Sequence, residues 1–465
     1  MARFNLRPYQ REAVDAVVGE WSNGVRSTLL VMATGTGKTV VFAEVIRRWK
    51  QSHPGRGVLV MAHRRVLVEQ ARKKLEGIDG VEVATVQAAS RRAQRTPADA
   101  YGLIVIDEAH HSLARSYKAV IDRYAGADVL GVTATPERAD GVDMGEVFDT
   151  VAYTYDMADG IRDGYLSQVR ICAAPLAVDL GGVHTRQGDY DAKELAGAVE
   201  PLLKSAARWI KENASDRHVV VFLPLVETAK KMADACAEVG LASEEVDGES
   251  VGRDAALKRF EDGETQVLCN AALLTEGWDA PICDCVMVLR PTQSRALYVQ
   301  MVGRGTRLHD GKSDLLVPDV LALNAKHDVM RPADVFLADH DEAVDLMEAA
   351  DAEPATVEEL KERRDVVAER EAALVAAAAQ DELEDLGWLN RALSHDDGKP
   401  ADEKRRQEGG RGFARRAARF VGRALLGTAK VAGKVAFGLA KYSVGLGAAI
   451  MVGFVRGFFG VRASR

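Results

Sequence analysis

The segment that most constrains the fold is a run of small residues, Ala33–Thr39, between an apolar stretch and a helical one. Ser27–Met32 is short and aliphatic, as a buried strand is, and Val40–Gln51 has a helical pattern. A Gly-x-Gly-Lys-Thr loop that opens a helix lets backbone N–H groups approach phosphates closely. The segment therefore predicts a parallel α/β sheet with a phosphate site at its edge. The alternative is a Gly-rich turn that arose by chance.

The same alternation of short apolar runs and helical stretches continues to about residue 325 and restarts once on the way. At 465 residues the chain is too long for one core. Two parallel α/β domains in series are therefore expected, with residues 1–160 as the first domain, 161–205 as a linker and the start of the second domain, and 206–335 as the second domain. The expected strands are Ser27–Met32, Val58–Ala62, Leu103–Ile106 and Val129–Val132, then Val219–Leu223, Gln266–Leu268, Val286–Leu289 and Leu315–Val320.

Charge is distributed unevenly in the C-terminal part of the chain. Residues 336–410 are predicted to form an acidic, mostly helical extension and linker, and Asp339–Glu403 carries a net charge of −15. Residues 411–465 form a basic, Gly-rich tail with an amphipathic pattern. Its longest uncharged run, Tyr442–Val455, is short of the roughly 20 residues needed to span a bilayer. Binding to nucleic acid or a partner protein, association with an anionic membrane surface, and a poorly ordered tail all stay open.

The five cysteines form no CxxC pair and no Cys/His spacing typical of zinc. Buried reduced thiols and a reducing compartment are expected, with no zinc. The first seven residues contain no apolar signal core, so we expect a cytoplasmic protein, or one in the host cytoplasm if it is phage-encoded.

Two carboxylates follow the apolar run Leu103–Ile106. Asp107, at the strand tip, can hold Mg²⁺ through water, and Glu108 can take a proton from an attacking water. Lys38 can reach the β- and γ-phosphates, and the Thr39 hydroxyl can ligate Mg²⁺. An acidic helix cap after a strand is the alternative interpretation of this carboxylate pair.

Arginines are the third element of this chemistry. Arg304 and Arg307 follow Gln300 at a spacing that places them on one helical face. A guanidinium suits the spread negative charge of a transferring phosphoryl group, so we expect Arg307 to act as an arginine finger with Arg304 beside it. Alone, this segment would equally fit a solvated basic face. The phosphate loop lies about 260 residues before these arginines in the sequence. The site therefore works only if two domains close on each other, as in a motor.

Together these motifs resemble those of superfamily 2 helicases of the DEAH-box type, over about residues 3–330. Within that superfamily the closest resemblance is to the RadD-like DNA repair helicases of bacteria and their phage relatives. The segments that carry it are Leu6–Gln10, Ala62–Arg65, Thr85–Gln87, Asp107–His110, Thr133–Pro136, Asp179–Val183, Thr275–Pro281 and Gln300–Leu308. Trp278 departs from the usual Phe, and no cysteine follows Cys285, where relatives often carry a zinc element.

The resemblance implies two RecA-like domains and assigns further roles. Gln10 would read the base. We favour a role for His110 in sensing the γ-phosphate and linking to Gln300, with an exposed residue at a helix start as the alternative interpretation of His110. The implied ATP-binding set is Arg7, Gln10, Thr34, Gly35, Thr36, Gly37, Lys38, Thr39 and Asp279. The implied coupling set is His110, Thr133, Thr135, Gln300 and Gly277. The implied nucleic-acid contacts are His63, Arg64, Thr85, Gln87 and Thr275.

The expected function is an ATP- and Mg²⁺-dependent helicase or translocase on DNA, single-stranded or branched, in replication, recombination or repair. RNA fits the same backbone contacts. Two alternatives stay open. One is a nucleic-acid-stimulated ATPase that remodels protein–DNA complexes without unwinding, and the other is the motor subunit of a restriction system.

Overall fold

The computed structural model describes residues 5–63, 65–111, 115–135, 144–186, 188–247, 252–271, 280–323, 328–337, 339–348 and 350–366. Residues 1–372 form one compact unit. The basic tail predicted at 411–465 lies outside the described residues.

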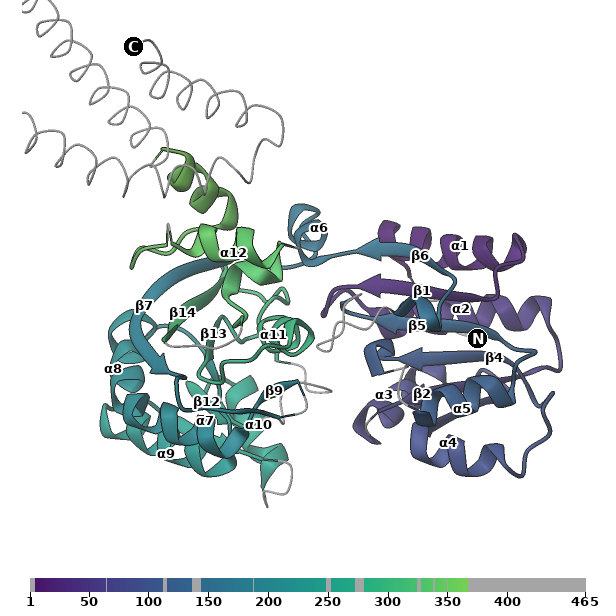
Figure 1. Ribbon diagram of the computed structural model, residues 1–465, viewed down its shortest axis with the longest axis horizontal. Coiled ribbons are helices and arrows are strands. Elements are labelled where there is room, and N and C mark those ends of the chain that lie inside the picture. Colours follow the sequence, from purple (N-terminus) through teal and green to yellow (C-terminus); the bar gives the residue numbers. More distant parts are fainter. Residues whose placement is uncertain are drawn as a thin grey trace, which may run out of the picture. The chain divides into compact units, whose positions relative to one another are not determined.

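The first domain is built on a six-stranded sheet in the order β3-β2-β4-β5-β1-β6, in which every neighbouring pair is parallel (Figure 1). Short apolar strands buried on both faces favour this arrangement. The strands are β1 Ser27–Met32, β2 Gly57–Ala62, β3 Val81–Thr85, β4 Tyr101–Asp107, β5 Asp128–Thr133 and β6 Thr150–Tyr155. The helices are α1 Pro8–Ser22, α2 Lys38–Ser52, α3 Arg65–Leu75, α4 Val86–Ala93, α5 Arg115–Arg123 and α6 Met157–Arg162, with short 3-10 turns at Ala109–His111 and Met144–Glu146.

A second six-stranded parallel sheet follows, in the order β11-β12-β10-β13-β14-β7. Its strands are β7 Val169–Asp179, β10 Val219–Phe222, β11 Ser243–Val246, β12 Val267–Asn270, β13 Cys285–Val288 and β14 Leu315–Leu323. Its helices are α7 Ala192–Val199, α8 Leu203–Asn213, α9 Val226–Glu238, α10 Arg253–Glu261, α11 Arg295–Val302 and α12 His340–Met347, with 3-10 turns at Glu200–Leu202 and Pro332–Val335. A two-stranded hairpin joins β8 Thr185–Arg186 to β9 Asp189–Tyr190.

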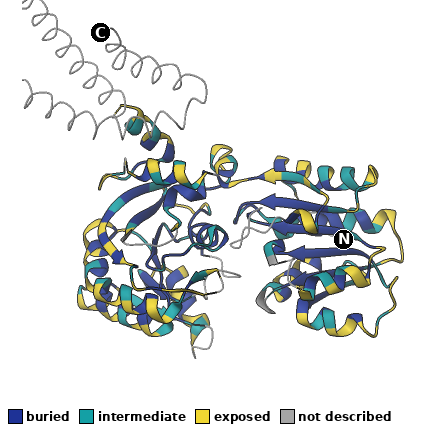
Figure 2. Ribbon diagram, in the orientation of Figure 1, coloured by how far each residue is buried: buried dark blue, intermediate teal, exposed yellow. Residues whose placement is uncertain are grey.

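Each sheet separates two hydrophobic layers because successive strand residues point to opposite faces. In β4, Leu103 and Val105 pack with α1, α2 and α3, whereas Ile104 and Ile106 pack with α4 and α5. In the second sheet α10, α11 and α12 cover one face and α7, α8 and α9 cover the other. Figure 2 shows the strands as buried and the outer sides of the helices as exposed. The predicted fold of two tandem parallel α/β domains is confirmed.

All five cysteines are buried, three of them in or beside the strands β12 and β13. Within the described part of the chain, no helix is both long and apolar enough to cross a membrane.

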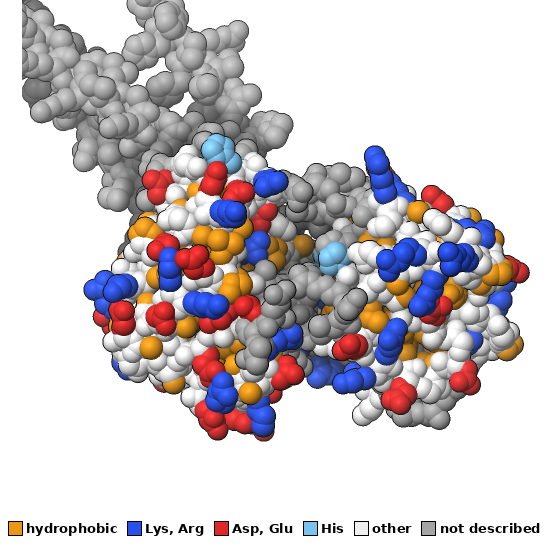
Figure 3. Space-filling model, turned by 90° about the horizontal axis from the view of Figure 1, so that it is seen from below, with side chains coloured by type: hydrophobic (Ala, Val, Ile, Leu, Met, Phe, Trp, Pro, Cys, Tyr) orange, Lys and Arg blue, Asp and Glu red, His pale blue; other side chains and the backbone are white. Residues whose placement is uncertain are grey.

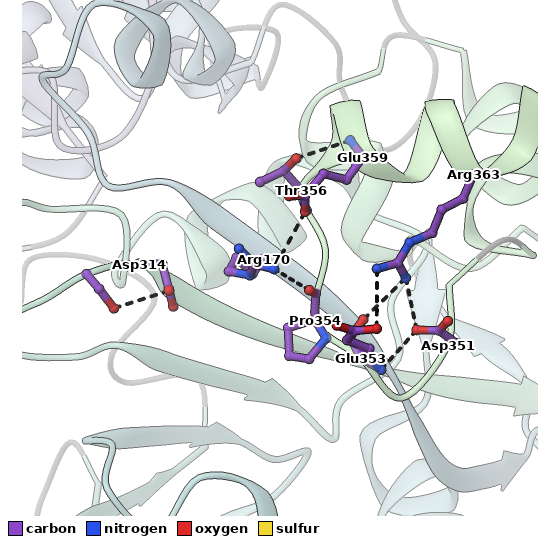
Figure 4. A network of polar contacts seen from close by, with 9 residues as sticks. Arg170, Asp314, Asp351, Glu353, Pro354, Thr356, Glu359 and Arg363 are labelled. Atoms are coloured by element: carbon purple, nitrogen blue, oxygen red, sulfur yellow. Dashed lines mark hydrogen bonds and ion pairs between the residues drawn. The ribbon is translucent and has the colours of Figure 1, made fainter.

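The first part of the acidic extension completes the second sheet (Figure 4). The backbone N–H of Ile171 in β7 donates to Ala355 O at 2.7 Å, and the N–H of Ala355 donates back to Ile171 O at 2.8 Å. Arg170, on the same strand, donates to Pro354 O and lies 3.6 Å from Glu359. The side chain of Leu360 is fully buried in the core of this domain. Residues 350–360 thus cover the edge of β7, which would otherwise present unpaired backbone groups.

This docking predicts that the extension contributes to the stability of the second domain. Leu360→Ala is expected to lower the free energy of unfolding by about 2–5 kcal/mol, since it leaves a cavity in the core. Val366→Ala, on the same segment but 47% exposed, is the matched control and should change it by less than about 0.5 kcal/mol. Urea unfolding followed by circular dichroism measures both, and equal effects would mean that residues 350–366 do not pack as described.

Candidate active site

The phosphate loop lies at the carboxyl end of β1. The hydroxyl of Thr36 donates to Ala33 O at 2.6 Å, and Gly35 and Gly37 both have a φ of +88°. Helix α2 begins at Lys38 with no side-chain cap and no acidic residue in its first turn. The N-terminal N–H groups of a helix have no intrahelical partner. This loop therefore offers N–H groups to an anion, and it fits the phosphates of a nucleotide.

The two glycines are required by both conformation and space. A φ near +88° is rarely adopted by a residue that has a Cβ atom. A Cβ at Gly37 would lie 2.6 Å from Gln10 Nε2, and one at Gly35 would lie 3.2 Å from Leu166 Cδ2 and 3.3 Å from Arg307 Cγ. The loop is thus closely surrounded by other parts of the chain.

Tyr9 and Gln10 at the start of α1 hold this loop from one side. The hydroxyl of Tyr9 and the Nε2 of Gln10 both donate to Thr36 O, at 2.7 and 2.9 Å. Gln10 Oε1 accepts the backbone N–H of Arg7 at 3.0 Å. The amide of Gln10 is therefore already bonded at both ends, and its role in reading the base stays a prediction. The Arg7 guanidinium lies 4.8 Å from the centre of the Tyr165 ring, an arrangement that favours a cation–π contact.

The carboxylate pair lies at the end of β4. Asp107 is buried, and Glu108 has a φ of +54°, the only positive φ of a non-glycine residue among the residues described. Such a conformation stores about 1–3 kcal/mol and is concentrated at functional sites. The Thr39 hydroxyl, at the start of α2, and the Asp107 carboxylate supply oxygen ligands of the kind Mg²⁺ prefers. Since β4, β5 and β1 are adjacent and parallel, both groups belong to the same edge of the sheet.

His110 connects this carboxylate pair to the end of β5. Its Nδ1 lies 3.5 Å from Glu108 Oε2 and 3.4 Å from Thr133 Oγ1. Thr133 Oγ1 in turn donates to Thr135 O at 2.8 Å. Three of the predicted coupling residues, His110, Thr133 and Thr135, are therefore joined in one chain of contacts with Glu108. Gln300 is buried in α11, and its link to His110 stays a prediction.

The arginine loop, Gly303–Arg307, follows α11. The expectation that Arg304 and Arg307 share a helical face is wrong, because α11 ends at Val302 and both arginines lie in the turns after it. Arg304 is buried, and burial lowers the pKa of Arg307. A Cβ at Gly303 would lie 2.8 Å from Thr34 Cβ, and Arg307 lies against Gly35 as described above. The two halves of the divided site are thus in contact.

Ser167 and Lys312 also contact the arginine loop, although no motif marked them. Ser167 Oγ and Lys312 Nζ both donate to Arg307 O, each at 3.0 Å. Lys38 is the first residue of α2, and its Nζ lies 3.4 Å from Met32 O.

The predicted nucleic-acid contacts of the first domain lie on two adjacent strand ends. His63 follows β2, and Thr85 ends β3, paired in register with Ala62. The hydroxyl of Thr85 caps α4 by accepting the N–H of Ala88 at 3.3 Å, and Gln87 is exposed in the first turn of that helix. Arg64, Thr275, Gly277 and Asp279 lie outside the described residues.

The two sheets correspond to two known family models. Residues 3–89 and 78–138 match the model "Type III restriction enzyme, res subunit". Residues 200–309 match the model "Helicase conserved C-terminal domain". The first match contains the phosphate loop and the carboxylate pair, and the second contains the arginine loop.

Individual relatives agree with these matches. The chain is 30% identical, over 77% of its length, to a Saccharomyces cerevisiae protein named as an ATP-dependent helicase, IRC3, of which it covers 56%. It is 27% identical, over 65% of its length, to the Escherichia coli type I restriction enzyme EcoAI endonuclease subunit, of which it covers 44%. The chain thus spans about half the length of these relatives.

A solved structure extends the agreement to the fold. A fragment of an HsdR subunit of a type I restriction enzyme from Vibrio vulnificus superimposes with a TM-score of 0.55 at 26% identity, covering 70% of this chain and 65% of that one. With two parallel six-stranded sheets, the phosphate loop on the first and the arginine loop on the second, the chain belongs to the superfamily 2 helicases.

Proposed function

We propose that this chain is an ATP-dependent motor that translocates along nucleic acid and unwinds it, with DNA as its substrate. The observation that carries the proposal is the contact between the arginine loop of the second domain and the phosphate loop of the first. Residues that hydrolyse a nucleotide only when two domains meet can convert turnover into movement of those domains.

Bound ATP supplies the transferable phosphoryl group, and Mg²⁺ neutralises its charge. Lys38 and the N–H groups at the start of α2 bind the phosphates, and Thr39 and Asp107 hold the metal. Glu108 accepts a proton from water, and His110 orients its carboxylate from 3.5 Å. Arg307, assisted by Arg304, stabilises the charge that develops on the phosphoryl oxygens.

The strand is held mainly through its backbone, by His63, Thr85 and Gln87, together with Arg64 and Thr275. Contacts of this kind give little sequence preference. On the face that Figure 3 shows, Lys and Arg side chains are interspersed with Asp and Glu. We infer that the chain of contacts from Glu108 through His110 to Thr133 and Thr135 couples hydrolysis to the strand ends of the first sheet.

The sequence Asp107–His110 supports the DEAH-box type within the superfamily. The segments Ala62–Arg65, Asp179–Val183 and Gln300–Leu308 support a RadD-like role in DNA repair.

A second candidate function is the motor subunit of a restriction system. The match to the restriction-enzyme family model and the two restriction-enzyme relatives favour it. For this second candidate we expect movement on duplex DNA without separation of the strands. Three results together would support this candidate. Duplex DNA would stimulate ATP hydrolysis, the motor would displace the third strand of a triplex, and it would release no strand from a forked duplex. Release of the forked strand at the rate of ATP turnover would support unwinding.

Two substitutions test the hydrolysis site. Lys38→Ala removes the phosphate-binding cation, and Glu108→Gln removes the base, so each should lower DNA-stimulated ATP turnover by about 10²-fold or more. Lys211→Met, at an exposed position of α8, is the control and should leave turnover unchanged. Turnover is measured as phosphate release with and without single-stranded DNA. A normal rate in either active-site variant contradicts the assignment.

The phosphate loop is tested by a pair of Gly→Ala variants. Gly37→Ala forces a Cβ into the left-handed region at a cost of about 1–2 kcal/mol, and it should also abolish the thermal stabilisation by ADP and Mg²⁺. Gly197→Ala, inside α7 with open space around it, should raise stability by about 0.5–1 kcal/mol and leave the ADP effect intact. Differential scanning fluorimetry with and without ADP measures both. If both variants respond to ADP as the wild type does, the loop does not bind the nucleotide.

The substrate is tested by a panel of single-stranded, forked, branched and RNA ligands. DNA ligands with a single-stranded part should stimulate ATP hydrolysis most, because the proposed contacts read the backbone of one strand. The same panel with residues 411–465 deleted reports whether the tail binds substrate, since a tail that does so lowers the concentration of DNA needed for half-maximal rate. Stimulation by RNA alone would contradict the proposal of a DNA motor.

A further inference from the structure

Lys312, five residues after the arginine loop, is bonded to backbone carbonyls only. Its Nζ donates to Cys283 O at 2.7 Å, to Arg307 O at 3.0 Å, and to Gly305 O. An ammonium group has three N–H donors and no acceptor. All three of its donors are therefore used, and two of them hold carbonyls of the arginine loop.

Burial of this ammonium is unfavourable by itself. Burial lowers the pKa of Lys312 to about 8, while the nearby Cys283, Asp284 and Asp314 raise it and Arg217 lowers it further. A charge is retained in such a place only where its hydrogen bonds offset the lost hydration. The three carbonyls are the groups that provide this compensation.

The arginine loop needs external support because it contains two glycines. Gly303 and Gly305 give its backbone more freedom than other residues would. A Cβ at Gly305 would lie 2.3 Å from Leu315 Cδ1, so this glycine allows the loop to pack directly on β14. Without further bonds, this flexible backbone would leave the Arg307 side chain free to point in several directions.

Ser167, just before β7, completes the support from the other side. Its N–H donates to Thr306 O at 2.7 Å, and its Oγ donates to Arg307 O at 3.0 Å. A carbonyl oxygen has two lone pairs. Both acceptor positions of Arg307 O are thus occupied, one by Lys312 and one by Ser167.

We propose that Lys312, with Ser167, is a positioning residue that fixes the backbone of Arg307 so that its guanidinium meets the phosphate loop. Lys312 acts through the carbonyls of the arginine loop, to which its Nζ is bonded. The inference rests on the proposed function, because it takes Arg307 as the group that assists ATP hydrolysis.

The test is a double-mutant cycle on DNA-stimulated ATP hydrolysis by the full chain. Lys312→Met keeps the length of the side chain but removes its donors, and it should lower kcat about tenfold while KM for ATP changes less than about threefold. In an Arg307→Ala background the same substitution should lower kcat less than about twofold further, because the residue that it positions is gone. Ser167→Ala should behave in the same way with a smaller loss, and Lys211→Met is the control with no effect.

A merely structural role gives a different result. Lys312→Met would then lower kcat by the same factor in both backgrounds, or change stability and leave kcat intact, and either outcome overturns the proposal. Should Lys312→Met fail to fold, Ser167→Ala carries the same cycle through the other donor to Arg307 O. A wild type without ATP hydrolysis would overturn the proposed function itself, whereas an active wild type with additive losses overturns only the role of Lys312.

Discussion

The shared carboxyl edge of the first parallel sheet is the constraint on which the rest of this site depends. Adjacent parallel strands end at the same edge, so the phosphate loop after β1, the carboxylates after β4 and Thr133 at the end of β5 are brought together by topology alone. Hydrogen bonds and polar contacts between side chains then refine their positions. Tyr9 and Gln10 fix Thr36 O, and His110 lies between Glu108 and Thr133. Polar residues that are far apart in the sequence are thus brought together at one edge of the sheet.

The second domain contributes positive charge, in the side chain of Arg307, beside the phosphate loop of the first domain. In the proposed site the Lys38 ammonium would bind the phosphates from the first domain, and Arg307 lies against Gly35 from the second. The cost of burying guanidinium groups is visible in the lowered pKa of Arg307. Such a cost is best offset when an anion occupies the space beside them. Under the proposed mechanism, nucleotide binding and contact between the domains would therefore favour each other, which is the thermodynamic basis of a motor.

The arrangement could be predicted from the sequence mainly where a recognisable motif follows a clear strand or helix pattern. The strand before Ala33 and the apolar run before Asp107 were found where expected, whereas the arginines after Gln300 lie beyond the end of α11 and not on a helical face. The strand β7 was not predicted, because it lies at a sheet edge, alternates between buried and exposed residues and contains Pro175. The strand β11 was also missed, because it is an edge strand in which three of the four residues are polar and only partly buried. Lys312 lies in the charged stretch Asp310–Asp314, and only tertiary packing shows that its donors reach carbonyls 5 to 29 residues away.

A motor of this kind faces two opposing demands. If Arg307 assists hydrolysis as proposed, it must be held in place during the reaction, yet it must lose its partner when the domains separate. The chain meets both by fixing the backbone and leaving the side chain to exchange partners. Lys312 and Ser167 bond to Arg307 O from within the second domain. In the proposed cycle these bonds would therefore persist when the guanidinium leaves the phosphate loop. Support through side-chain bonds to Arg307 would instead have to break in every cycle.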